Sequence, residues 1–279
     1  MSFRNIYNYV SCLAIVLLIN ACGTPVTDSD ELDGEDSATL VQKAKNDKIQ
    51  KIFATIPAQQ ETMAMLDEAE ARYSSKFLNP IENVAKYSSV KSRALNLGIY
   101  GIDLGVTNIF DQTQESMLYL RCTNKMATSL GISGAFDEKM SERIDASSDN
   151  KDSLLTIITD SYRNADNYLQ ENGQPGVSSL MVVGGWIEGM YVATQIASAS
   201  STAQTIIDKV ASEKATLENL ISLLVDYKAE NEGTEDILGS LNELKAIYDA
   251  TSGKLTPEQF KQIADKVAEI RNGIIQQTS

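Results

Sequence analysis

The sequence contains no histidine, and this absence excludes several kinds of chemistry at once. Serine and cysteine nucleophiles that depend on histidine cannot occur, and neither can zinc or iron sites with imidazole ligands. Basic residues are also scarce: 24 Lys and Arg stand against 38 Asp and Glu, a formal charge of −14 over 279 residues. Because binding to nucleic acid needs basic groups that neutralise phosphates, no nucleic-acid partner is expected.

The first 22 residues have the pattern of a secretory signal. Arg4 is their only charged residue, and an apolar run extends from Cys12 to Ile19. So short a run predicts a signal peptide over residues 1–21 rather than a membrane span. The ending Leu-Ile-Asn-Ala-Cys resembles the lipobox of bacterial lipoproteins, which implies cleavage before Cys22, acylation of that residue and anchoring in a membrane. The alternative is an ordinary signal peptide in which Cys22 occurs by chance.

Residues 22–37 are expected to form an acidic, flexible tether. Six acids and no base fall between Asp28 and Asp36, and such a segment stays solvated. Acidic runs close behind a lipidated cysteine resemble the surface-export signals of Bacteroidota lipoproteins, which implies the outer membrane. Display on the cell surface and an orientation toward the periplasm both remain open. An EF-hand loop is excluded, because Asp33 occupies the position that requires glycine.

From about residue 38 onward, apolar residues recur at spacings of three and four without strand alternation. This predicts an all-α, multi-helix antiparallel bundle, with a helical core at 38–199 and a C-terminal segment of three helices at 200–279 packed on it. The three helices are expected near 202–231, near 235–250 and from Thr256, where Thr256-Pro257-Glu258-Gln259 forms a capping box. Short loops favour this arrangement over the alternative, an intermolecular coiled coil.

Two segments of the core, Leu95–Phe110 and Ser179–Ala193, are apolar on nearly all sides. Both are too short to span a bilayer, so we expect buried central helices flanked by helices at 111–130 and 151–172. Glycine destabilises a helix interior, and its repetition predicts close helix packing, with room for a ligand as the alternative. The glycines are Gly98, Gly101 and Gly105 on the first helix, and Gly185 and Gly189 on the second.

Asp103 and Glu188 are isolated acids within these two apolar helices. A carboxylate is costly to bury alone, so each needs a partner. The candidate cations are Arg93, Arg121 and Lys125, and the candidate hydroxyl donors are Tyr100, Tyr119 and Tyr191. One interpretation is a ligand pocket and the other is an internal salt bridge. The pocket would be formed by Asp103, Glu188, Tyr100, Arg121, Tyr191 and Trp186.

No cofactor, metal site or catalytic residue is predicted. A metal held by carboxylates would lack the Glu-x-x-His ligands of di-iron bundles, and Asp137, Glu138 and Glu142 fit a solvated helix face. Ser88–Lys91 and Ser148–Asn150 match two motifs of penicillin-recognising serine enzymes, but the third motif, K-T-G, is absent. Both matches have local explanations as helix caps. We expect Cys122 to be a buried structural thiol, because no histidine can activate it.

The segment from Ala94 to Val192, with NLGIYGIDLG and GGWIEGMYVAT, is similar to uncharacterised helical lipoproteins of the Bacteroidota. The resemblance implies a fold and a location rather than an activity. We therefore expect a non-enzymatic binding or scaffold module, lipid-anchored in the outer membrane, with an unidentified protein partner. The alternative is a carrier of a small ligand or metal around Asp103 and Glu188.

Overall fold

The computed structural model describes residues 65–135, 151–228 and 233–277, together with positions 43, 47, 49, 51, 52 and 143. In these ranges the regular elements are helices and none is a strand, which confirms the all-α multi-helix bundle. The expected signal peptide, the tether and Cys22 lie outside the described residues. So do Asp137, Glu138 and Glu142, and the segment Ser148–Asn150.

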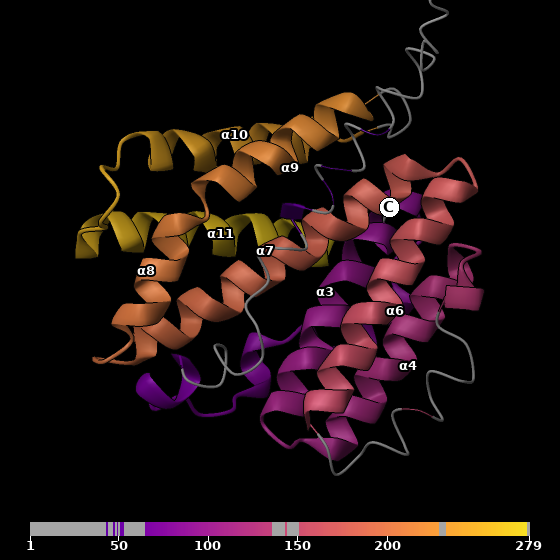
Figure 1. The fold of residues 1–279 in the computed structure, drawn as a ribbon, viewed down its shortest axis with the longest axis horizontal. Helices are drawn as coiled ribbons and strands as arrows, with labels where there is room; N and C mark the ends of the chain where they lie inside the picture. Colours follow the sequence, from indigo (N-terminus) through magenta and orange to yellow (C-terminus); the bar gives the residue numbers. More distant parts are fainter. Residues whose placement is uncertain are drawn as a thin grey trace, which may run out of the picture.

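The first part of the described chain forms one helical layer. Its short 3-10 helices are η1 (Ser75–Phe77), η2 (Ile81–Ala85) and η3 (Ser133–Ala135), and its long helices are α3 (Val90–Ile109), α4 (Thr113–Ser129) and α6 (Lys151–Glu171). Helix α3 packs against α4 and α6. The three long helices lie side by side in Figure 1, coloured from purple to pink.

Helix α7 (Pro175–Ala199) runs diagonally across the molecule and connects this layer to the C-terminal helices (Figure 1). These are α8 (Gln204–Ser212), α9 (Lys214–Asp226), α10 (Glu235–Asp249) and α11 (Pro257–Gln276). Helix α7 packs against α3 and α6 on one side and against α8, α9 and α11 on the other. The C-terminal segment is therefore packed on the core through α7, and α11 also contacts α3.

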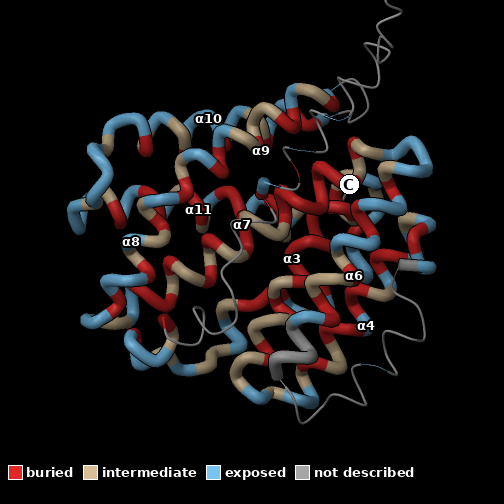
Figure 2. The backbone as a smooth tube through the Cα atoms, in the orientation of Figure 1, coloured by how far each residue is buried: buried red, intermediate tan, exposed pale blue. Residues whose placement is uncertain are grey.

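Buried residues are concentrated along α3 and α7 (Figure 2). By length and composition α7 could cross a membrane, but 72% of its most apolar window is buried by other parts of the protein. The sequence expectation of two buried glycine-rich helices is thus confirmed.

Glycine allows the backbones of α3 and α7 to touch. A Cβ atom added to Gly98 would lie 2.0 Å from the carbonyl oxygen of Met181, and one added to Gly184 would lie 2.0 Å from that of Leu95. Neither position has space for a methyl group, because the obstacle is helical backbone. Gly101 is different: there an added Cβ would meet the ring of Tyr162 on α6.

The other glycines on the predicted faces do not all serve this contact. An added Cβ on Gly185 would make ordinary contacts with Gly98, and one on Gly189 would meet nothing within 4 Å. Gly184, which was not among the glycines expected from spacing, approaches the Leu95 backbone of α3 instead. Gly105 is half-buried on α3.

The helix expected at 202–231 is divided into α8 and α9 at Glu213, so the C-terminal segment has four described helices rather than three. The Glu213 side chain is buried and accepts a hydrogen bond from Trp186 Nε1 at 3.0 Å. Lys209 on α8 pairs with the same carboxylate. The capping box is present as expected: Thr256 Oγ1 accepts from Gln259 N, and Gln259 Oε1 accepts from Thr256 N.

Gly184→Ala should destabilise the protein strongly, whereas Gly189→Ala should not. The first places a methyl group against the Leu95 carbonyl and forces α3 and α7 apart, and overpacking of this kind costs about 1–3 kcal/mol or more. The second fills open space and removes a helix-interior glycine, a gain of up to about 1 kcal/mol. Urea denaturation of both variants measures the difference, and equal stabilities would contradict the assignment of the contact.

Candidate functional site

The loop at residues 77–81 joins the end of η1 to the start of η2 and packs against α3, α4 and α11. Its backbone is irregular at 78–80, and Pro80 is exposed. Leu78 is 2% exposed and Asn79 is fully buried. Buried backbone groups outside a helix must find other partners, because each unpaired one destabilises the fold. Side chains from three helices supply those partners.

Four of the loop's backbone groups are paired by named side chains. Asn79 N donates to Asp103 Oδ2 at 3.1 Å, and Arg271 Nη2 donates to Phe77 O at 3.2 Å. The hydroxyl of Tyr119 donates to Asn79 O, and that of Tyr100 donates to Pro80 O, both at 3.1 Å. The loop is therefore held by α3, α4 and α11 together.

The Asn79 side chain extends this network. Its Nδ2 donates to Tyr87 OH and to Asn96 Oδ1, each at 3.0 Å, and its Oδ1 accepts from Asn83 Nδ2 at 2.8 Å. Tyr87 OH also lies 3.3 Å from the carbonyl oxygen of Ile275 near the end of α11. Such a network fixes one position of the loop relative to the surrounding helices.

Glu188 is paired with Arg271, and both groups are buried. Arg271 Nε donates to Glu188 Oε2 at 2.9 Å, and Arg271 Nη2 donates to Oε1 at 3.0 Å, so the pairing is bidentate. The guanidinium also stacks 4.6 Å from the ring centroid of Tyr191. Burial opposes the guanidinium charge, but Glu188 outweighs it and raises the pKa of Arg271 above its ordinary value.

Asp103 lies beside this ion pair, and within the described ranges the cation that acts on it is Arg271, which already pairs with Glu188. Burial raises its pKa well above the ordinary value, and the neighbouring Glu188 carboxylate raises it further; Arg271 and the Asn79 N–H act in the opposite direction. Burial also raises the pKa of Glu188, an effect that Arg271 opposes. Each of these two acids perturbs the pKa of the other, so their carboxyl groups lie close together. The structure thus brings together the two acids that the sequence singled out.

The expected cations were wrong. Arg121 and Lys125 are exposed on α4, and Arg93 donates to the backbone carbonyls of Tyr87 and Ser129. The cation is Arg271, which was not among the expected partners. It lies four residues after Val267 and three before Ile274, within the apolar stripe of α11, and that position was the available signal.

The remaining members of the predicted pocket have separate partners. Tyr191 stacks on Arg271, Tyr100 holds the loop and Trp186 bonds to Glu213. Arg121 is exposed elsewhere. Of the two interpretations of the acids, the geometry favours the internal salt bridge.

Two further motif residues and one cysteine have structural positions. Ser89 caps α3 by accepting from Ser92 N, and Lys91 donates to the carbonyl of Gly233 at 2.6 Å. Cys122 is 4% exposed, with its Sγ 3.9 Å from Ile81 O. Burial, reinforced by Asp103, raises the pKa of this thiol to about 11, so it is a weak nucleophile at neutral pH.

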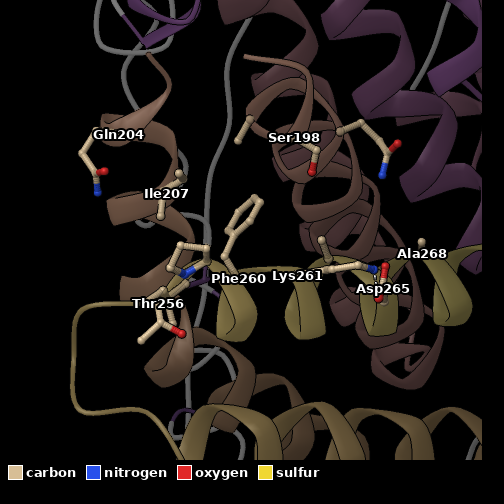
Figure 3. Close-up of a pocket in the computed structure, with 13 residues that line it drawn as sticks. Ser198, Gln204, Ile207, Thr256, Phe260, Lys261, Asp265 and Ala268 are labelled. Carbon is tan, nitrogen blue, oxygen red and sulfur yellow. Dashed lines mark hydrogen bonds and ion pairs between the residues drawn. The ribbon is translucent and has the colours of Figure 1, made fainter. Parts of the chain in front are cut away.

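An open groove of about 620 Å³ lies away from this cluster, between the end of α7, the start of α8 and the first half of α11 (Figure 3). Its floor is apolar and includes Phe260 and Ala264. Among the described residues, the charged ones that line it are Lys261 and Asp265, which pair with each other. The neutral polar residues that line it are Gln195, Ser198, Gln204 and Thr256.

Arg271→Met should destabilise the protein by about 3–5 kcal/mol, because it leaves the Glu188 carboxylate buried without its counter-charge. Adding Glu188→Gln should recover a substantial part, since residue 188 then no longer places a buried carboxylate without a counter-charge. Arg121→Met is the matched control, and an exposed substitution of this kind should change stability by about 0.5 kcal/mol or less. Chemical denaturation distinguishes these outcomes, and a double variant less stable than Arg271→Met would contradict the pairing.

Comparison of the chain with protein-family models, curated proteins and solved structures found no match.

Proposed function

We propose that this chain is a non-enzymatic binding module, anchored by lipid on Cys22 in the outer membrane, whose groove between α7, α8 and α11 takes a short uncharged peptide segment of a protein partner. One observation carries this proposal. The titratable groups buried at the centre are paired with one another and with the loop, whereas the groove is open and its lining carries no net charge.

The groove has the size and chemistry that a peptide segment needs. A hollow of about 620 Å³ falls within the usual range for ligand sites, about 300–1,000 Å³. Side-chain amides both donate and accept, so Gln195 and Gln204 match the N–H and C=O groups of a peptide backbone. Phe260 and Ile207 supply apolar contact from two different helices (Figure 3). A charged ligand would find no unpaired counter-charge among Lys261 and Asp265.

The alternative, a carrier built around Asp103 and Glu188, has less support. Both carboxyl groups are fully buried, and their contacts are with Arg271, Asn79 and each other. The described ranges also contain no group of three Cys, Asp or Glu placed to bind a metal.

Photo-crosslinking in cells of the native host tests the groove. A crosslinking amino acid at Ala268, which lines the groove, should capture a protein partner. The same amino acid at Ala246, which is exposed on α10, should not. Ser198→Trp should fill the groove and abolish the adduct from Ala268. Equal yields from both positions, or an adduct that persists with Trp at 198, would contradict a groove-bound partner.

Cys22→Ser tests the anchor independently. The variant should keep its signal peptide or be released from the membrane fraction, because no acyl chains can be attached. Mass spectrometry of the wild-type N-terminus should find an acylated Cys22. External protease on intact cells then separates surface display, in which the protein is cleaved, from a periplasm-facing anchor, in which it is protected. An unmodified Cys22 in a membrane-bound protein would refute the lipid anchor.

A further inference from the structure

Two buried acids face one buried cation at the junction of α3, α7 and α11. Both carboxylate oxygens of Glu188 accept hydrogen bonds from Arg271, and Arg271 Nη2 also donates to Phe77 O. Asp103 Oδ2 accepts from Asn79 N, while Asp103 Oδ1 is buried and receives no hydrogen bond from any donor in the described part of the chain. Asp103 Oδ1 has the Glu188 carboxylate as its neighbour. If Oδ1 carries a proton, it can donate a hydrogen bond to that carboxylate and is no longer without a partner.

We infer that Asp103 and Glu188 hold a single proton between them in the folded protein, and that this proton keeps the loop at 77–81 seated against α3, α4 and α11. The proton lies on Asp103 and is donated to Glu188. The cluster is then neutral, with one carboxylate against one guanidinium. Removing the proton would place two negative charges against one positive charge in a fully buried site, which is costly.

The described titratable groups around Asp103 and Glu188 do not gain or lose a proton at ordinary pH. Those facing it are phenols, a thiol and the guanidinium, and each keeps its charge state from acidic to mildly alkaline pH. Burial raises the pKa of each phenol and of the thiol, and Glu188 raises that of Arg271. By element they are Tyr73 and Tyr87 from the segments before α3, Tyr100 on α3, Tyr119 and Cys122 on α4, Tyr162 on α6, Tyr191 on α7 and Arg271 on α11. Asp103 and Glu188 are therefore the groups of this described cluster that titrate first as the pH rises.

The sign of the pH dependence follows from the raised pKa of Asp103. In the unfolded chain Asp103 releases its proton near pH 4, whereas the folded protein retains it. The folded state therefore binds more protons than the unfolded state, and stability falls as the pH rises from about 4 toward the folded pKa. The unfolding equilibrium constant should rise by up to about tenfold per pH unit from this site alone.

Asp103→Asn is the variant that tests the proton. Its amide NH₂ can donate to Glu188 and its oxygen can accept from Asn79 N, as the protonated acid does. From pH 5 to pH 8 the ratio of unfolding constants, wild type over D103N, should increase by up to about tenfold per unit. Asp160→Asn, at a half-exposed position on α6, should give a constant ratio. A constant or falling ratio for D103N, or a D103N protein that does not fold at pH 7, would overturn the inference.

Cys122 reports on the loop itself, because its thiol packs against Ile81. Alkylation of Cys122, measured by peptide mass spectrometry, should rise more steeply between pH 7 and pH 9 in the wild type than in D103N. An ionised Asp103 disfavours the thiolate, so faster labelling reports loop opening rather than thiolate formation. Equal rates in the two proteins would overturn the role of the proton in seating the loop.

Discussion

The guanidinium of Arg271 is the contact on which the two halves of the bundle depend. It comes from the last helix, yet it pairs with Glu188 in the middle of α7 and with Phe77 O before α3. A buried ion pair contributes little net stability, because dehydrating both charges offsets their attraction. We expect its effect to be on specificity instead. Any other placement of α11 on α7 would leave a charge or a carbonyl buried without a partner.

The close approach of α3 and α7 places the two acids within reach of that single cation, and the sequence predicted this approach only in outline. Two apolar segments that tolerate glycine indicated two buried helices in contact, and both are present. Which glycines touch depends on the rotation of each helix about its axis. Gly184 and Gly185 are about 100° apart around α7, so residue spacing could not show that Gly184 rather than Gly189 meets the neighbouring backbone.

Features determined by a few consecutive residues were predictable, and features that join distant segments were not. The capping box at Thr256 needs only four neighbours in sequence, and it formed as expected. The pairs Arg271–Glu188 and Arg271–Phe77 join positions 83 and 194 residues apart, and a single sequence contains no pattern that links them. The break at Glu213 was missed for the same reason, since its partner Trp186 lies on another helix.

The hydrogen bond between Tyr87 and Ile275 spans 188 residues, and its position has a consequence for how the chain is made. A ribosome adds the last turn of α11 only after the described helices from α3 to α10 have been synthesised. Until then the loop near Asn79 and the Glu188 carboxylate lack their C-terminal partners. Completion of the native centre must therefore wait until α11 has been translated, because contacts this distant in sequence cannot form before both partners exist.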